Sequence, residues 1–161
     1  MSHEGEQWQR LSVAFGLCMP VANLKSPSPK LALELYLGEY RPFYLAREED
    51  AMARKHLQEK SGLLVIGRPL SGKTRMALEA MLAVVPDGIL LRFTGPQRLA
   101  KLDALVIPRV SINGKKERPS LVVFFDDIDK FDGAPFDELI DRLYPQVSKL
   151  YVVATCQSGA A

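Results

Sequence analysis

The sequence predicts an α/β fold, a three-layer sandwich in which a mostly parallel sheet lies between two layers of helices. The first observation is a set of continuous apolar runs, which are typical of strands buried on both faces of a sheet. These runs are LLVIG (63–67), ILLRF (89–93), LVVFF (121–125) and YVVAT (151–155). The second observation is that segments with helical periodicity separate the runs, and this alternation indicates a sheet with helices on both faces.

The composition indicates one globular domain. The chain has 161 residues, of which 47% are hydrophobic and 25% charged, and this balance excludes disordered and fibrous classes. The net charge is only +2. The one dense basic run, 115–118, is interrupted by Glu117, so we interpret it as a solvated loop and expect no nucleic-acid partner.

Cysteine usage and hydropathy favour a cytoplasmic protein. Two cysteines and two histidines lie far apart, without disulfide or metal-ligand spacing, which is the pattern of a reducing compartment. The apolar stretch 11–24 contains Pro20 and is too short to cross a bilayer. We therefore expect it to form a strand or short helix that packs on the core, and we expect no membrane partner.

Punctuation by proline and the placement of charges mark the other elements along the chain. Two prolines in SPSPK (26–30) break any element there, so we expect a leader of unknown role over 1–38 and a core over 39–161. The core begins with a helix at 48–60, which has acids in its first turn and bases toward its end. Further along the chain, we expect a helix at 73–85, a helix from Pro96 that ends before Pro108, a polar loop at 113–120 and a helix that begins at Pro135.

The segment GRPLSGKT (67–74) follows a predicted buried strand and begins a predicted helix. In that position backbone N–H groups can curl around a phosphate, and Gly67 and Gly72 permit close approach. We expect Lys73 to reach the β- and γ-phosphates and Thr74 to bind Mg²⁺. The predicted nucleotide-binding residues of this segment are Gly67, Arg68, Pro69, Leu70, Ser71, Gly72, Lys73, Thr74 and Arg75. The alternative is a surface turn rich in glycine and proline.

A phosphate loop needs an acid at the end of another buried strand to serve its metal. Asp126 follows LVVFF in this way, 52 residues after Thr74, so we expect it to bind Mg²⁺ directly or through water. Asp127 is the candidate that orients or deprotonates the attacking water. The alternatives are a cap or turn residue for Asp126 and a surface carboxylate for Asp127.

These motifs resemble those of the additional-strand P-loop ATPases, in particular the STAND and AAA+ branches. FYLAREED (43–50) is similar to their hydrophobic-Gly-Arg-Glu-x-Glu box, with Arg47 and Glu48 matching and Ala46 in place of the glycine. The strand at 151–155 ends at Thr155, where the family carries a polar sensor residue. The resemblance covers about residues 40 to 157.

The resemblance implies a P-loop NTPase fold that is incomplete at its C-terminus, with ATP or ADP and Mg²⁺ as cofactors. It implies that Arg47 lies near the nucleotide and that Asp127, Lys73 and Thr155 serve catalysis. Adenine is expected over guanine from the resemblance and from the lack of an NKxD-like motif. STAND proteins often carry an arginine just after the sensor residue, whereas this chain has Gln157, which brings no charge to the phosphate.

These residues are compatible with three alternative functions. The first is an ATPase module, weak or inactive as an isolated fragment, whose turnover resets a conformational switch in a larger STAND-type protein. The second is a scaffold that binds ATP or ADP without useful hydrolysis. The third is a small-molecule phosphotransferase, for which the sequence shows no acceptor pocket or lid. The resemblance also implies a protein partner or self-association through C-terminal domains that this chain lacks.

The same resemblance predicts where the sheet is open. The strand at 63–66 is expected beside the sensor strand on one side, and the family's fifth strand, which would cover its other side, is absent. An apolar edge without a charged or proline residue recruits other chains, so the isolated chain is expected to be marginally stable and prone to aggregation. The alternative is that residues 11–24 cover this edge.

Overall fold

The computed structural model describes residues 3–36, 47–68 and 71–158. Within them, five strands form one sheet in the order β1-β3-β6-β7-β2. Strands β3, β6, β7 and β2 are parallel to one another, and β1 pairs antiparallel with β3. The strands of this sheet are β1 (Gly16–Pro20), β2 (Gly62–Gly67), β3 (Ile89–Phe93), β6 (Ser120–Phe125) and β7 (Lys149–Gln157).

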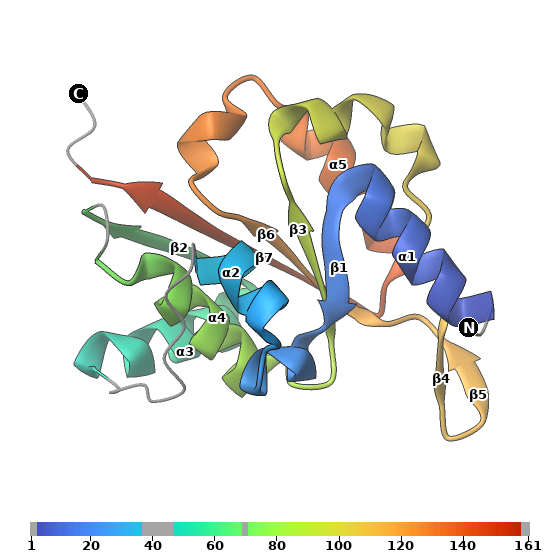
Figure 1. Ribbon diagram of the computed structural model, residues 1–161, viewed down its shortest axis with the longest axis horizontal. Helices are drawn as coiled ribbons and strands as arrows, with labels where there is room; N and C mark the ends of the chain where they lie inside the picture. Colours follow the sequence, from blue (N-terminus) through green and yellow to red (C-terminus); the bar gives the residue numbers. More distant parts are fainter. Residues whose placement is uncertain (1–2, 37–46, 69–70, 159–161) are drawn as a thin grey trace.

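Helices cover both faces of the sheet, which confirms the predicted α/β sandwich. In Figure 1, α1 and α5 lie on one side, and α2, α3 and α4 lie on the other. The α-helices are α1 (His3–Phe15), α2 (Pro29–Tyr36), α3 (Glu48–Lys60), α4 (Lys73–Val84) and α5 (Phe136–Leu143). The 3₁₀ helices are η1 (Val21–Lys25), η2 (Pro96–Ala104), η3 (Ile128–Phe131) and η4 (Tyr144–Gln146).

Strand β6 explains why its sequence is a continuous apolar run. Val122 and Phe124 pack into the core layer beneath α3 and α4, whereas Val123 and Phe125 pack into the opposite layer with α1 and α5. All four side chains are buried. Because successive residues of a strand point to opposite faces, a strand covered on both sides needs apolar residues at every position.

The predicted helices at 48–60 and 73–85 are confirmed within one residue. The segment after Pro96 is a 3₁₀ helix with a kink at Lys101 instead of an α-helix. The predicted polar loop at 113–120 is wrong in part, because β4 (Val110–Ile112) and β5 (Lys115–Glu117) form an antiparallel hairpin there. Asn113 and Gly114 connect them with φ of 52° and 80°, the positive values that a two-residue hairpin turn requires.

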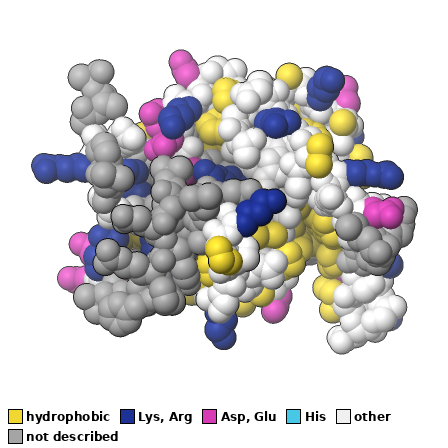
Figure 2. Space-filling view, in the orientation of Figure 1, with side chains coloured by type: hydrophobic (Ala, Val, Ile, Leu, Met, Phe, Trp, Pro, Cys, Tyr) yellow, Lys and Arg dark blue, Asp and Glu magenta, His cyan; other side chains and the backbone are white. Residues whose placement is uncertain are grey.

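The basic run at 115–118 is therefore an exposed hairpin strand and not a loop. On the face shown in Figure 2, the Lys and Arg side chains of the described residues lie apart from one another instead of forming one basic surface. No helix in the described part of the chain is long and apolar enough to pass through a bilayer.

The leader contributes an edge strand to the sheet. Leu11 and Phe15 of α1 pack into the same core as Phe93 of β3, and β1 then pairs with β3. Strand β2 lies at the opposite edge, as predicted, and among the described residues it pairs with β7 alone. The alternative in which residues 11–24 cover the β2 edge is therefore wrong, because α1 anchors this segment to the far side of the sheet. The expected boundary at residue 38 lies outside the described residues.

Candidate functional site

Gly67 and Gly72 flank the described ends of the loop after β2, and each lies where glycine is favoured. A Cβ atom on Gly67 would lie 2.7 Å from Ser71 Oγ and 3.2 Å from Lys73 Cγ, so only glycine fits without a shift. Gly72 caps α4 with φ of 86°, in the left-handed region that favours glycine. Glycine is therefore favoured at both positions, by close side-chain packing at Gly67 and by the backbone conformation at Gly72.

Lys73 is held inside this loop. Its side chain is buried, with 9% of the residue exposed, and Nζ donates to the Arg68 carbonyl at 2.9 Å. A buried ammonium next to the first turn of a helix forms an electropositive cavity suited to an anion. Pro69 and Leu70, which were also predicted to bind nucleotide, lie outside the described residues.

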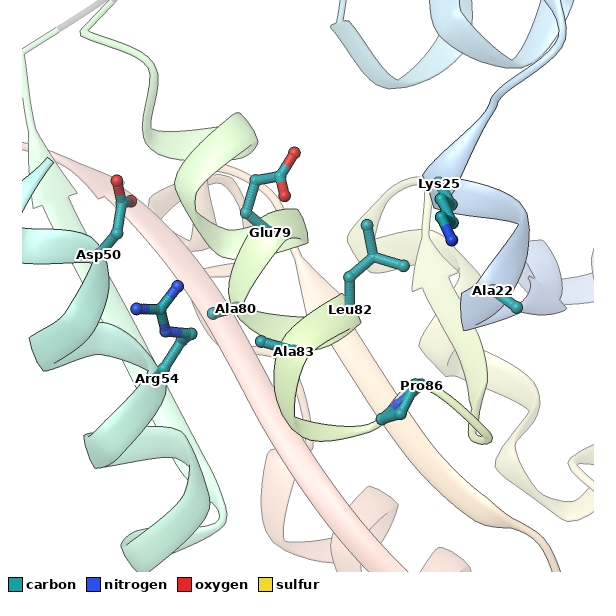
Figure 3. Close-up of a pocket in the computed structure, with 9 residues that line it drawn as sticks. All are labelled: Ala22, Lys25, Asp50, Arg54, Glu79, Ala80, Leu82, Ala83 and Pro86. Carbon is teal, nitrogen blue, oxygen red and sulfur yellow. The ribbon is translucent and has the colours of Figure 1, made fainter. Parts of the chain in front are cut away.

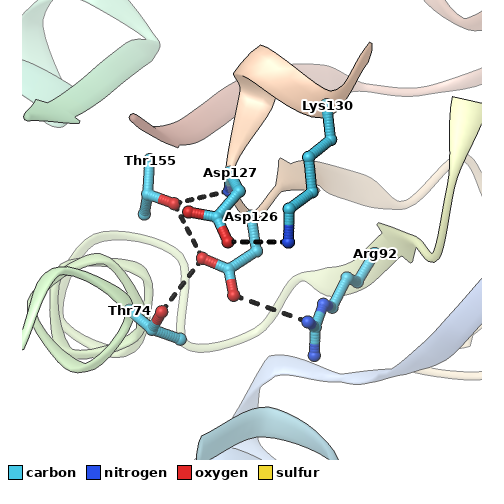
Figure 4. Close-up of polar contacts among 6 residues, drawn as sticks. All are labelled: Thr74, Arg92, Asp126, Asp127, Lys130 and Thr155. Carbon is cyan, nitrogen blue, oxygen red and sulfur yellow. Dashed lines mark hydrogen bonds and ion pairs between the residues drawn. The ribbon is translucent and has the colours of Figure 1, made fainter. Parts of the chain in front are cut away.

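Asp126, which follows β6, forms hydrogen bonds with residues of α4 and β7. Its Oδ1 accepts hydrogen bonds from the hydroxyls of Thr74, at 2.9 Å, and Thr155, at 2.7 Å (Figure 4). The three residues lie on α4, after β6 and in β7, far apart in the sequence. The structure thus brings together the predicted metal residues and the predicted sensor residue around one carboxylate oxygen.

Thr155 also positions Asp127. Thr155 is fully buried, and its Oγ1 accepts the backbone N–H of Asp127 at 2.8 Å. Asp127 has φ of 56°, a left-handed conformation that is uncommon for a residue with a side chain. One hydroxyl therefore fixes the carboxylate of the first acid and the backbone of the second.

Two cationic residues, to which the sequence analysis gave no role, lie next to the two acids. Arg92 Nη2 lies 3.5 Å from Asp126 Oδ2, and Lys130 Nζ lies 3.3 Å from Asp127 Oδ2 (Figure 4). Arg92 is the charged residue of the otherwise apolar run ILLRF. A charged residue inside a buried strand requires a partner of opposite charge. Arg92 was therefore the sequence signal for an arginine beside one of the acids.

Arg47 lies at the start of α3 and reaches the loop from the other side. Its Nη1 donates to the Ser71 carbonyl at 3.4 Å. Between α3, the β2 edge and the loop is an open cavity of about 490 Å³. Residues that line it include Arg47, His56, Ile66, Gly67, Lys73 and Met76. Residues 43–46 of the predicted box lie outside the described part of the chain.

Two further predicted positions can be placed. Arg75 forms an ion pair with Glu79 along α4, with Nε 2.8 Å from Oε1. Gln157 is the last residue of β7 and pairs with Gly67, so it lies beside the first residue of the loop.

A separate cavity of about 510 Å³ lies between η1, α3 and α4 (Figure 3). Ala80, Ala83 and Pro86 form an apolar part of its lining, with Asp50 and Arg54 beside them on α3. None of the predicted site residues lines it. The chemistry predicted from the sequence therefore lies elsewhere, at the carboxyl ends of the parallel strands.

Comparison with known proteins does not assign this chain to a family. No protein-family model matches the sequence, and no curated protein matches it. A solved structure that it resembles is that of PCH-2 from C. elegans, with 11% sequence identity and a TM-score of 0.36. The match covers 94% of this chain and 42% of that chain, so this chain spans less than half the length of its neighbour. A similarity this low carries no argument about function, which depends on the geometry of the site.

Proposed function

We propose that this chain binds Mg·ATP at the loop 67–74 and hydrolyses it, as the NTPase module of a larger STAND-type protein whose conformation it switches. The observation that carries the proposal is the 2.9 Å hydrogen bond between Thr74 and Asp126. A hydroxyl and a carboxylate that lie 52 residues apart in the chain meet at the head of a glycine-lined turn. This pairing is what a Mg²⁺-dependent phosphate site requires.

The residues present fit the proposed ligand. Gly67 leaves room for the Ser71 and Lys73 side chains to pack against its backbone, and the ammonium of Lys73 is held by the Arg68 carbonyl at the start of the loop. Thr74 and Asp126 would hold Mg²⁺, a cation that prefers oxygen ligands. Bound Mg·ATP supplies the phosphoryl group and a cation that neutralises its charge. The loop and the first turn of α4 bind and orient the phosphates through their N–H groups.

Asp127 is the proposed group that orients the attacking water. Its backbone N–H donates to Thr155 Oγ1, and its carboxylate Oδ2 lies 3.3 Å from Lys130 Nζ, so both its backbone and its side chain have partners beside Asp126. Thr155 touches both acids and is proposed as the sensor that keeps their geometry fixed. Positioning of this kind supplies much of the catalysis in phosphoryl transfer.

The nucleoside is proposed to lie in the cavity beside Arg47. The cavity borders Gly67 and Lys73, so a base and ribose there would continue from phosphates held in the loop. Its volume of about 490 Å³ falls within the usual range for ligand pockets, ~300–1,000 Å³. Adenine is proposed over guanine from the motifs that resemble the STAND and AAA+ branches.

A second function is favoured by Gln157. This uncharged residue lies beside Gly67 at the end of β7, where STAND proteins often carry an arginine. Less positive charge near the γ-phosphate means weaker stabilisation of the transition state. The alternative proposal is therefore a scaffold that binds ATP or ADP and changes partner contacts without useful turnover.

The test is calorimetric titration of Mg·ATP into wild-type, Lys73→Ala and Lys60→Ala proteins. A charge-assisted contact contributes about 1.5–3 kcal/mol, so Lys73→Ala should weaken binding roughly ten- to a hundredfold. Lys60 is exposed at the end of α3, and its replacement removes the same charge without an effect on binding. Equal affinities in all three proteins would refute the phosphate-loop proposal. Steady-state phosphate release above that of Lys73→Ala separates the ATPase from the scaffold.

A further inference from the structure

A third cavity, larger than the two described above, lies on the other side of the acid pair from the phosphate loop. It has a volume of about 840 Å³ and borders Asp126 and Asp127. Its walls come from α1, β1, the end of β3 with the start of η2, and the end of β6 with η3. The carboxyl ends of parallel strands are where α/β sheets bind ligands, and β3 and β6 both end here.

Three cationic side chains from separate elements line this cavity: Arg92, Arg98 and Lys130. Two of them face the two acids, so the lining carries one more positive than negative charge. Arg98 has a different anchor, because its Nη1 donates to the carbonyls of Val13 and Ala14 at the end of α1. The leader helix therefore holds a guanidinium in a defined position on the cavity wall.

The two ion pairs are long for charge-assisted contacts. Arg92 and Asp126 are 3.5 Å apart and Lys130 and Asp127 are 3.3 Å apart, whereas a tight pair of this type has about 2.7–2.9 Å between its atoms. Lys130 is also mostly exposed, with 69% of its side chain accessible, so its pair contributes little to stability. An anion that enters the cavity can therefore bind Lys130 at small cost, while Arg92 can contact the anion and Asp126 together.

The rest of the lining is mixed. Leu17, Phe93 and Phe131 add apolar surface, while Ser12, Thr94 and Gln97 add polar groups. A few polar and charged groups set among apolar surface are typical of small-molecule pockets, which have volumes of about 300–1,000 Å³.

We propose that this cavity is a second ligand site, which binds a small molecule through a phosphate or carboxylate group held by Arg92, Arg98 and Lys130. The apolar wall receives the body of the molecule. The site is built jointly by the leader and the core, which gives α1 and β1 a functional role besides their packing at the edge of the sheet. The proposal that this site lies next to a bound nucleotide rests on the proposed function. The proposal that it binds an anion does not.

The experiment is an NMR titration of the full chain, without nucleotide or Mg²⁺, with inorganic phosphate and separately with succinate. The site predicts saturable shifts of the amide signals of Gly16, Leu17, Thr94 and Gly95, which border the cavity. A response to phosphate alone or to succinate alone identifies the anionic group, and either one supports the site. Shifts confined to residues 67–74, or no shifts, would overturn the proposal. Because the cavity is read without nucleotide, failure of the proposed ATP binding leaves this result unaffected.

Three variants test the cations. Arg98→Ala should weaken the binding that the cavity amides report by roughly tenfold or more, since it removes a charge-assisted contact. Lys130→Gln should weaken it roughly two- to fivefold, and this exposed position carries little risk of misfolding. Lys115→Ala removes the same charge from the remote β4–β5 hairpin and should leave the affinity unchanged (Figure 1). Equal affinities in Lys130→Gln, Arg98→Ala and Lys115→Ala would refute the assignment.

Discussion

Replacement of Thr155 by valine tests whether one hydroxyl organises both acids. The side chain keeps its size but loses Oγ1, which donates to Asp126 Oδ1 at 2.7 Å and accepts the Asp127 N–H at 2.8 Å. Thr155 is fully buried, so water cannot replace the hydroxyl. A hydrogen bond to a charged group contributes about 1.5–3 kcal/mol, and a buried donor without a partner costs about 1–3 kcal/mol.

The lost hydrogen bond to Asp126 and the unpaired N–H of Asp127 do not add in full, because both acids are partly exposed and water can compensate in part. We therefore expect Thr155→Val to reduce the free energy of unfolding by about 2–3 kcal/mol. In a chain of this length that corresponds to a decrease in Tm of roughly 4–12 °C. Urea denaturation followed by circular dichroism measures the change, provided that the slope with denaturant stays constant.

Two further variants make the result specific to the hydroxyl. Thr155→Ser keeps Oγ and loses one methyl group, so it should cost only about 1 kcal/mol. Thr94→Val makes the same substitution at an exposed position at the end of β3 and should stay within about 0.5 kcal/mol of wild type. A Thr155→Val protein as stable as Thr155→Ser would refute the reasoning, because the hydroxyl would then carry no net energy.

Three other predictions follow from the site and the sheet. Asp126→Asn should reduce Mg²⁺-dependent ATP binding, whereas Asp127→Asn should keep binding and lose most phosphate release; equal loss of binding in both would show that the roles are wrong. Leu64 and Ile66 on the β2 edge strand are 52% and 61% exposed, so changing both to threonine should reduce self-association in size-exclusion chromatography, and an unchanged profile would count against an adhesive edge. Burial raises the pKa of Cys18 from 9.0 to about 12, so the unfolded thiol ionises first and stability should fall as pH rises from about 9 toward 12. The loss should be roughly 1 kcal/mol at pH 10 and absent in Cys18→Ala, as urea denaturation at pH 8 and pH 10 would detect.

Local patterns in the sequence were sufficient for most elements of the core. The run LVVFF predicts β6 because a strand covered on both faces must be apolar at each position. The helices at 48–60 and 73–85 have periodicity and charge placement that depend only on neighbours along the chain. The Asn113-Gly114 turn was also readable, as a hairpin signal between short strands, and the prediction of a loop overlooked it.

Some residues of the candidate site could also be predicted from local sequence, and others could not. The spacing of Gly67, Gly72 and Lys73 is a local property, because the turn that they form is closed by residues within the segment itself. Asp126 was readable as an acid at the end of a buried strand. The cations at Arg92 and Lys130 were not assigned, since a single charge in a strand or a loop does not show which carboxylate it will meet.

By itself, the sequence determined the α/β class, the glycine-lysine segment at 67–74 and the acid that follows β6, since each depends on residues close together in the chain. Only the tertiary structure decided that β1 pairs antiparallel with β3 instead of covering β2. It also decided that Thr74, Asp126 and Thr155 share one oxygen, and that the cavity beyond the acids is lined by three cations. The physical reason is that these contacts join segments far apart in the chain, and their formation depends on how the helices pack against the sheet, which local periodicity does not encode.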